Sequence, residues 1–123
     1  MPKYVVKLQN GTQSTFYSQD EDIFIGRIPA INDLCINDPS VSRQHAQIRR
    51  KEGQYTIYDL KSLNGLSVNG KKVTRETLKH QDKVMLGDVE IVVYLKDDIE
   101  KENLKDIEQY EPTKTQASLK IKP

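Results

Sequence analysis

The sequence has little of what marks several large classes of protein. A single cysteine, Cys35, excludes an internal disulfide, and residues 1–18 contain no secretory signal pattern. We therefore expect an intracellular, cytoplasmic location. Lysine and arginine number 19 against 18 aspartates and glutamates, which is far from the basic excess of a protein that binds nucleic-acid backbones. The longest apolar run, 91–95, has five residues, whereas a membrane-spanning helix needs about 20.

Residues that could catalyse a reaction or bind a metal are few and scattered. Cys35, His45 and His80 lack the spacing of a zinc site, so we expect no metal and no cofactor. Ser42, His45 and Asp59 are the residue types of a hydrolytic triad, but no nucleophile elbow accompanies them. His45 is better explained as a neutral, hydrogen-bonded structural histidine. We expect a protein without enzymatic activity, with a hydrolase as the distant alternative.

The charges divide the chain of 123 residues into two unlike parts. Residues 1–96 carry 14 basic and 11 acidic residues (+3), and residues 97–123 carry 5 basic and 7 acidic residues (−2). One domain over residues 1–96 is expected, because a domain has roughly 100 to 150 residues. Residues 97–123 contain too few apolar residues to offset the entropy of ordering, so we expect a polar tail that is disordered or partly helical. The helical alternative depends on an irregular stripe formed by Ile99, Leu104, Ile107 and Tyr110.

Residues 1–96 have the pattern of an all-β domain. Short segments rich in valine, isoleucine, tyrosine and threonine alternate with turn dipeptides about every ten residues. Asn10-Gly11, Glu52-Gly53, Asn69-Gly70 and Gly87-Asp88 predict hairpins, the first with a two-residue turn. About ten strands, at 4–8, 13–17, 23–25, 34–36, 45–51, 54–60, 66–68, 72–73, 83–86 and 89–95, predict a sandwich of two antiparallel sheets. No helix is expected before residue 97, and Cys35 is expected to pack within a sheet.

Three unusual loops carry the candidate chemistry. Gly26-Arg27 follows a strand, residues 40–45 precede one, and residues 61–65 connect two others. Loops at one end of a sandwich are free to specialise for binding. Together these loops offer a permanent cation, hydroxyl donors, an amide and a glycine that lets backbone N–H groups approach a ligand. This combination suits an oxyanion, and phosphate in particular.

These loops also carry a resemblance to a known family. FIGR at 24–27, NDLCINDPSVSRQHAQI at 32–48 and DLKSLNGLSVNGKKV at 59–73 resemble the forkhead-associated (FHA) domain. The resemblance covers residues 4–95 and is specific, because several motifs occur in the right order and spacing. It implies an eleven-stranded β-sandwich that binds phosphothreonine peptides through loops at one end. That implied fold agrees with the strand pattern found independently.

The resemblance assigns roles to individual residues. It implies that Arg27 pairs with the phosphate, that Ser42 donates a hydroxyl hydrogen bond to it, and that Arg43 flanks it. Asn64 would clamp the main chain of the ligand. Four residues would shape the site without touching phosphate, namely Gly26, His45, Gly65 and Asn69. Several charge-assisted hydrogen bonds, less the ordering costs, predict a micromolar affinity of about −8 kcal/mol.

The chain departs from the family pattern at two places. Leu63 occupies a position where the family usually has threonine, whose hydroxyl can contact phosphate. Either the backbone N–H of Leu63 or the hydroxyl of Ser62 compensates, or the affinity is lower. The family usually has Gly-Asp where this chain has Gln81-Asp82. As the phosphorylated residue of the ligand, threonine should be preferred over serine but not absolutely. Burying the one methyl group that threonine has and serine lacks contributes only about 0.8 kcal/mol.

These observations predict a phosphothreonine-dependent interaction module in Ser/Thr-kinase signalling. Its partner would be a Thr-phosphorylated protein or peptide, from a kinase or its substrate, with no role for nucleic acid or membrane. The alternative is a degenerate FHA module that binds an unphosphorylated protein surface, which Leu63 favours. Thr113 and Thr115 are candidate phosphoacceptors in the tail, and either could dock on the site of its own or another copy. The basic segments 49–51 and 71–72 are expected to be exposed and to keep strand edges soluble, or to steer an acidic phosphopeptide.

Overall fold

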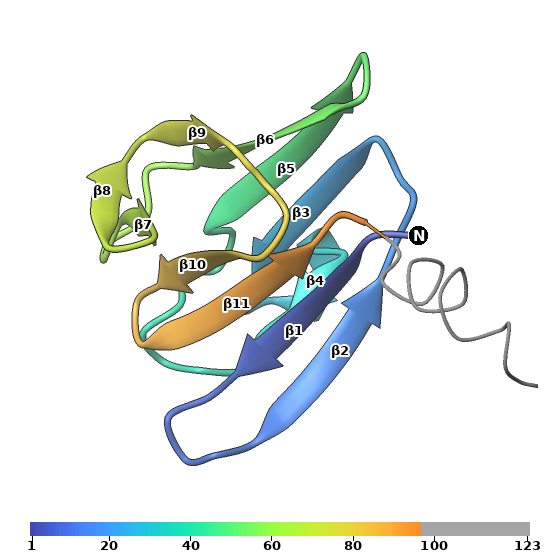
Figure 1. Cartoon of the computed structure of the whole chain (residues 1–123). Helices are drawn as coiled ribbons and strands as arrows, with labels where there is room; N and C mark the ends of the chain where they lie inside the picture. Colours follow the sequence, from blue (N-terminus) through green and yellow to red (C-terminus); the bar gives the residue numbers. More distant parts are fainter. Residues whose placement is uncertain (97–123) are drawn as a thin grey trace, which may run out of the picture.

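Two β-sheets packed face to face form the protein, and the computed structural model describes residues 1–96 (Figure 1). Predictions for the tail, including Thr113 and Thr115, lie outside the described residues. The six-stranded sheet has the order β2-β1-β11-β10-β7-β8, and all its strand pairs are antiparallel. Its strands are β1 (Lys3–Lys7), β2 (Gln13–Tyr17), β7 (Leu66–Val68), β8 (Lys71–Val73), β10 (Asp82–Leu86) and β11 (Val89–Tyr94).

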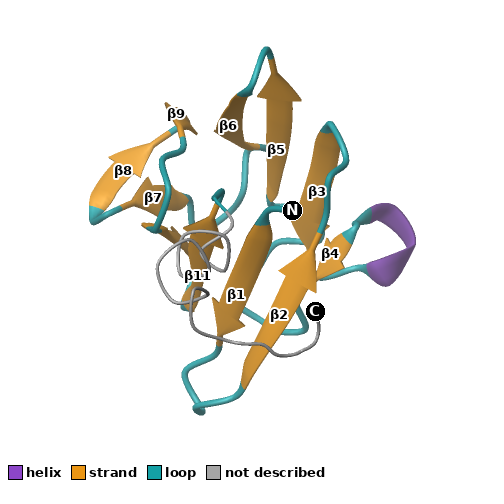
Figure 2. Ribbon diagram, turned by 45° about the vertical axis from the view of Figure 1, so that its right-hand side comes forward, coloured by secondary structure: helices purple, strands orange, loops and turns teal. Residues whose placement is uncertain are grey.

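The second sheet has five strands in the order β4-β3-β5-β6-β9. Its strands are β3 (Asp22–Gly26), β4 (Leu34–Cys35), β5 (Ala46–Lys51), β6 (Gln54–Asp59) and β9 (Arg75–Thr77). Only the short β3–β4 pair is parallel. A 3-10 turn, η1 (Pro29–Ile31), lies beside β4 and is the only helical element within residues 1–96 (Figure 2). The predicted all-β sandwich of two antiparallel sheets is therefore confirmed except for the parallel β3–β4 pair, and β9 is the strand that the sequence pattern did not indicate.

The turn dipeptides predicted four hairpins correctly, because β1–β2, β5–β6, β7–β8 and β10–β11 all pair antiparallel. Glu52-Gly53 has φ angles of 54° and 79° and joins paired residues of β5 and β6. Asn69-Gly70 has φ angles of 52° and 85° between β7 and β8. The two-residue turn expected at Asn10-Gly11 is wrong, because Lys7 pairs with Gln13 and leaves a five-residue loop, 8–12. Leu8 closes that loop by accepting a hydrogen bond from Gly11 and donating one to Thr12.

Strand alternation directs apolar side chains between the two sheets, where water is excluded and burial of apolar area is favourable. Cys35 is a strand residue of β4, as predicted, but the prediction that it packs in the sheet is wrong, because Cys35 is exposed whereas its neighbour Leu34 is buried. Desolvation raises the pKa of the buried Tyr4 hydroxyl above its ordinary value, and Tyr55 adds to the effect. The core includes Val6, Ile23, Ile25, Ala46, Ile48, Ile57, Leu66, Leu86, Val89, Ile91 and Val93.

The strand directions separate two ends of the sandwich. β3 ends at Gly26, β5 begins at Ala46, and β6 ends at Asp59, so the connecting loops gather at one end. At the opposite end, Tyr94 of β11 pairs with Lys3 of β1. Within residues 1–96, no helix is long and apolar enough to cross a membrane. The fold thus places the three unusual loops together and away from both ends of the described chain.

Candidate functional site

The loops at the end of the sandwich enclose a groove of about 360 Å³, here called the loop-end groove. Its lining comes from the segment after β3, the segment before β5, and the loop between β6 and β7. The lining residues are Arg27, Pro39, Ser40, Val41, Ser42, Arg43, Gln44, Leu63 and Asn64. Five of the six residues that the sequence assigned to phosphate or peptide contact therefore share one surface.

Arg27 is half-buried and fixed in position. Its backbone N–H donates to the carbonyls of Ser42 (3.0 Å) and Arg43 (3.1 Å). Its side-chain Nε donates to the carbonyl of Val41 at 3.0 Å. Within residues 1–96 the two terminal Nη groups have no protein acceptor. The guanidinium is thus oriented through one N–H and keeps its paired donors for an oxyanion, the geometry that suits bidentate binding.

Ser42 and Leu63 connect the two loops across the groove. The Ser42 Oγ accepts a hydrogen bond of 3.0 Å from the backbone N–H of Leu63. This bond occupies the N–H that could have replaced the missing threonine hydroxyl at position 63. A hydroxyl that accepts can still donate its own proton, so Ser42 remains able to bind phosphate. The Leu63 side chain is 90% exposed at the side of the groove.

Ser62 is the candidate residue that the structure does not bring into the groove. Its Oγ donates to a carboxylate oxygen of Asp59 and accepts from the N–H of Gly65 at 2.9 Å. Asp59, three residues earlier, captures the hydroxyl because a carboxylate is a stronger acceptor than water. Ser62 therefore stabilises its own loop, and its hydroxyl proton is already bonded to Asp59.

Asn64 lines the groove from the loop between β6 and β7. Its Nδ2 donates to the Ser40 carbonyl at 2.8 Å, which ties the two loops together. The Ser40 hydroxyl donates to Asp38 at 2.6 Å and accepts from the N–H of Asp88 at 2.8 Å. Hydrogen bonds from the Ser40 side chain and backbone lower the pKa of Asp38 below its ordinary value. The loop is thereby anchored to the turn between β10 and β11.

His45 is fully buried and supports two of the loops that form the groove. Its Nδ1 accepts from the backbone N–H of Ser42 at 3.1 Å, and its Nε2 lies 2.8 Å from the carbonyl of Gly65. These two partners require a proton on Nε2 and none on Nδ1, which is the neutral imidazole. The hydroxyl of Ser42 is not the partner of the ring, and Asp59 binds Ser62 instead. The triad residue types therefore do not form a hydrolytic triad.

Gly26 is required for space rather than for a special backbone angle. A Cβ at this position would lie 2.3 Å from the Arg43 carbonyl and 2.7 Å from the Asn32 side-chain nitrogen, whereas its φ is not in the left-handed region. The sequence analysis did not identify Asn32. Its Nδ2 donates to the carbonyls of Ile28 (2.8 Å) and Arg43 (2.7 Å), so it holds the backbone on both sides of the Arg27 loop. No periodic pattern marks it in the sequence.

Asn69 lies at the β7–β8 turn, at the other end of β7 from the groove. Its Nδ2 donates to Asp82, and its Oδ1 accepts from the N–H of Lys83, both at 2.9 Å. Gln81, where the family usually has glycine, adopts a left-handed φ of 72°. These contacts fix the start of β10, so the influence of Asn69 on the groove is indirect. Within residues 1–96 no cluster of three or more metal-ligating side chains occurs.

Comparison with known proteins adds independent evidence. An oxoglutarate dehydrogenase inhibitor from Corynebacterium jeikeium is 35% identical over 88 residues, which cover 72% of this chain and 60% of that protein. The glycogen accumulation regulator GarA from Mycolicibacterium smegmatis is 34% identical over 88 residues, covering 72% of this chain and 55% of that protein. The chain thus spans a little more than half the length of these relatives.

Solved structures agree with this likeness. An FHA domain from a structural and functional analysis of phosphothreonine-dependent FHA domain interactions superposes with a TM-score of 0.68 at 29% identity, covering 77% of this chain and 98% of that one. The family model described as FHA domain matches residues 23–87, a segment that contains the whole loop-end groove. Because this match covers more than half of the sequence, the chain belongs to the FHA domain family.

Proposed function

We propose that residues 1–96 are a phosphothreonine-dependent interaction module that performs no catalysis and binds a partner marked by a Ser/Thr kinase. One observation carries the proposal. The oriented guanidinium of Arg27, the hydroxyl of Ser42 and the amide of Asn64 line a single groove, and the Nη donors of Arg27 have no acceptor within residues 1–96. Arg43 adds a second cation to the lining. This set of donors matches a dianion attached to a peptide.

The energetics favour phosphate over a carboxylate in this groove. A phosphothreonine carries about −1.5 to −2 charges and three strong acceptor oxygens. Each charge-assisted hydrogen bond contributes roughly 1.5 to 3 kcal/mol. Bonds from Arg27 and Ser42, less the cost of ordering the peptide, give a micromolar affinity of about −8 kcal/mol. Leu63 contributes no hydroxyl donor, so the affinity should fall at the weak end of the micromolar range.

The partners follow from the same chemistry. A Thr-phosphorylated segment of a kinase or of its substrate would bind, which fits the intracellular setting expected from the single cysteine. Thr113 or Thr115, once phosphorylated, would compete for the groove of the same or another copy, because a tether of about 15 to 20 residues gives an effective concentration near millimolar. Self-association through a phosphorylated tail is therefore part of the proposal.

The decisive experiment is a calorimetric titration of the full chain. It uses a Thr-phosphorylated peptide library, the same peptides without phosphate, and the variants Arg27→Ala and Arg49→Ala. We expect binding only with phosphate, and a loss of about 100-fold with Arg27→Ala because two charge-assisted bonds disappear. Arg49→Ala removes an equal charge away from the groove and should change affinity less than about twofold.

A degenerate FHA module is the second candidate, and the 90% exposed Leu63 favours it because an apolar side chain at the groove could contact an unphosphorylated surface. Peptide binding that needs no phosphate and survives Arg27→Ala would establish this candidate and reject the first. Turnover of an ester substrate would reject both.

A further inference from the structure

The side of the five-stranded sheet that points away from the core is a second candidate binding surface, here called the outer face. Its side chains belong to strands whose opposite sides bury the core, and strand register places them in rows. Arg49 pairs with Thr56, which pairs with Thr77, and Gln47 pairs with Tyr58, which pairs with Arg75. The outer face comprises Asp22, Phe24, Gln47, Arg49, Lys51, Gln54, Thr56, Tyr58, Arg75 and Thr77.

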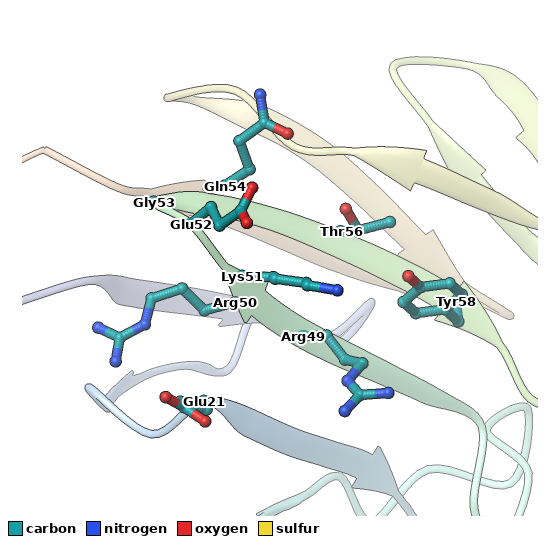
Figure 3. A pocket seen from close by; sticks show the side chains of 9 residues that line it. All are labelled: Glu21, Arg49, Arg50, Lys51, Glu52, Gly53, Gln54, Thr56 and Tyr58. Carbon is teal, nitrogen blue, oxygen red and sulfur yellow. The ribbon is translucent and has the colours of Figure 1, made fainter.

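Two adjoining hollows follow this surface. One of about 930 Å³ includes Arg49 and Lys51, and one of about 490 Å³ includes Arg75 and Lys79. Both hollows are lined by Thr56 and Tyr58, so they are continuous. Figure 3 shows the Lys51 side chain directed across the first hollow toward Thr56 and Tyr58.

The charge of the outer face is predominantly positive. Arg49, Lys51 and Arg75 are its cations, and Lys79 lines the second hollow beside it. Asp22 is the single carboxylate among the outer-face residues, and Glu76 also lines the second hollow. Asp22 is already paired with Arg49 at 3.1 Å. Two other carboxylates of the first hollow, Glu21 and Glu52, lie before β3 and in the β5–β6 turn. Arg49 and Asp22 form the only ion pair within residues 1–96, so Lys51, Arg75 and Lys79 remain for an acidic occupant.

The described chain ends beside this surface. The backbone N–H groups of Leu95 and Lys96 both donate to the Nδ1 of His80 at 3.1 Å. His80 directly follows Lys79, which lines the second hollow. Lys96, the last described residue, therefore lies close to the second hollow and at the end of the sandwich opposite the loop-end groove.

The sequence that follows has the complementary composition. Residues 97–111 contain seven acidic and two basic residues, a net charge of −5, and include Ile99, Leu104, Ile107 and Tyr110. The outer face offers cations together with the rings of Phe24 and Tyr58, which flank Gln47 in one row. Six strand residues extend about 20 Å, and fifteen residues can span at most about 50 Å. Length therefore permits this segment to lie along the whole face.

We propose that residues 97–111 dock on the outer face of their own chain, with their carboxylates near Lys51, Arg75 and Lys79. Each surface ion pair is weak, but the tether holds the acidic segment near millimolar effective concentration, which sustains a contact too weak to form between separate molecules. Because exposed charges carry the contact, it is released by salt: the screening length falls from about 8 Å at physiological ionic strength to about 3 Å at 1 M. The contact does not involve the loop-end groove and is independent of phosphate binding.

Paramagnetic broadening in the full chain tests this proposal. A nitroxide is attached at Gln109→Cys in a Cys35→Ser background, and amide signals are recorded for a labelled chain diluted with unlabelled, isotope-free chain. We expect broadening at Arg49, Thr56 and Tyr58, with the six-stranded sheet unaffected. The broadening should disappear at 1 M salt and in the double variant Lys51→Glu/Arg75→Glu. The matched control Lys7→Glu/Lys83→Glu reverses two exposed charges on the other sheet and should leave the broadening unchanged.

The other outcomes overturn the proposal in distinguishable ways. Broadening that arises only between different copies identifies a second molecule as the occupant. Broadening that is absent or spread evenly over both sheets leaves the outer face open for an acidic segment of another protein, which an added peptide of residues 97–111 would then mimic in trans. Unfolding of the double variant is detected by signal dispersion, and salt release in the unmodified chain then decides the question alone. Phosphopeptide affinity of Lys51→Glu/Arg75→Glu, measured in parallel, separates failure here from failure of the proposed function.

Discussion

The loop-end groove and the outer face are both cationic, yet they are constructed in opposite ways. Arg27 in the groove is half-buried and held by hydrogen bonds through its backbone and its Nε. Arg49 on the outer face has a side chain that is 60% exposed and a single ion pair to Asp22. The groove has a volume of about 360 Å³, much smaller than the 930 Å³ of the first hollow on the outer face. Fixed donors provide selectivity for one small anion, whereas exposed cations provide attraction without fixed geometry.

His45→Ala should give the largest difference between the two regions. The substitution removes a fully buried side chain and leaves the N–H of Ser42 and the carbonyl of Gly65 without partners. We expect the free energy of unfolding to fall by about 4 kcal/mol. Arg49→Ala should lower it by less than about 1 kcal/mol. Urea denaturation of both variants measures the contrast, and equal losses would show that the groove is no more strongly supported than the outer face.

Gly26→Ala and Gly53→Ala should separate crowding from backbone strain. A Cβ at Gly26 would lie 2.3 Å from a backbone oxygen, whereas one at Gly53 would contact nothing within 4 Å but would occupy a φ of 79°. We expect losses of unfolding free energy of about 3 kcal/mol at Gly26 and about 1 kcal/mol at Gly53. Thermal unfolding should rank the two melting temperatures accordingly. A larger effect at Gly53 would mean that the Arg27 loop can move aside.

Asn64→Ala should weaken binding without unfolding the protein. The side-chain amide links the two loops through Ser40 and lies in the groove lining. We expect the Kd for a phosphothreonine peptide to rise about tenfold, equivalent to about 1.4 kcal/mol. Gln54→Ala removes a comparable amide from the outer face and should leave the Kd unchanged. Titration calorimetry measures both, and an effect of Gln54→Ala would show that the peptide also uses the outer face.

Leu63→Thr should have the smallest effect and in the opposite direction. It restores a hydroxyl at a position where the backbone N–H is already bonded to Ser42. One added hydrogen bond, reduced by exposure, should tighten phosphopeptide binding about threefold. Leu63→Ala serves as the control, because it removes the side chain without adding a donor. Equal tightening by both variants would attribute the gain to lost bulk rather than to the hydroxyl.

Local rules account for the parts of the fold that the sequence predicted correctly. Gly53 and Gly70 supply positive φ angles at two-residue turns, and alternating apolar residues define most strands. Prediction fails where strand pairing overrides a local rule. Asn10-Gly11 has the composition of a tight turn, but the pairing of Lys7 with Gln13 sets a longer loop. β9 is short and polar, so its pairing with β6 is decided by tertiary contacts.

The site was predictable in composition but not in detailed contacts. The resemblance to the FHA domain implied roles for Arg27 and Asn64, and the structure places both in one groove. Spacing alone could not indicate that Asp59 captures the Ser62 hydroxyl, because that contact depends on how the loop turns back on itself. It also could not identify Asn32, whose bonds to Ile28 and Arg43 join the segment after β3 to the segment before β5.

The pairing of Lys3 with Tyr94 has a consequence for how this domain can be combined with others. Within residues 1–96, the first and last strands lie side by side. The start of β1 and the end of β11 are at the end of the sandwich remote from the loop-end groove. A protein segment joined directly before Lys3 or directly after Tyr94 would therefore begin at the end of the sandwich remote from the loop-end groove. The same sandwich could be inserted into a loop of a larger protein with the loop-end groove still facing solvent.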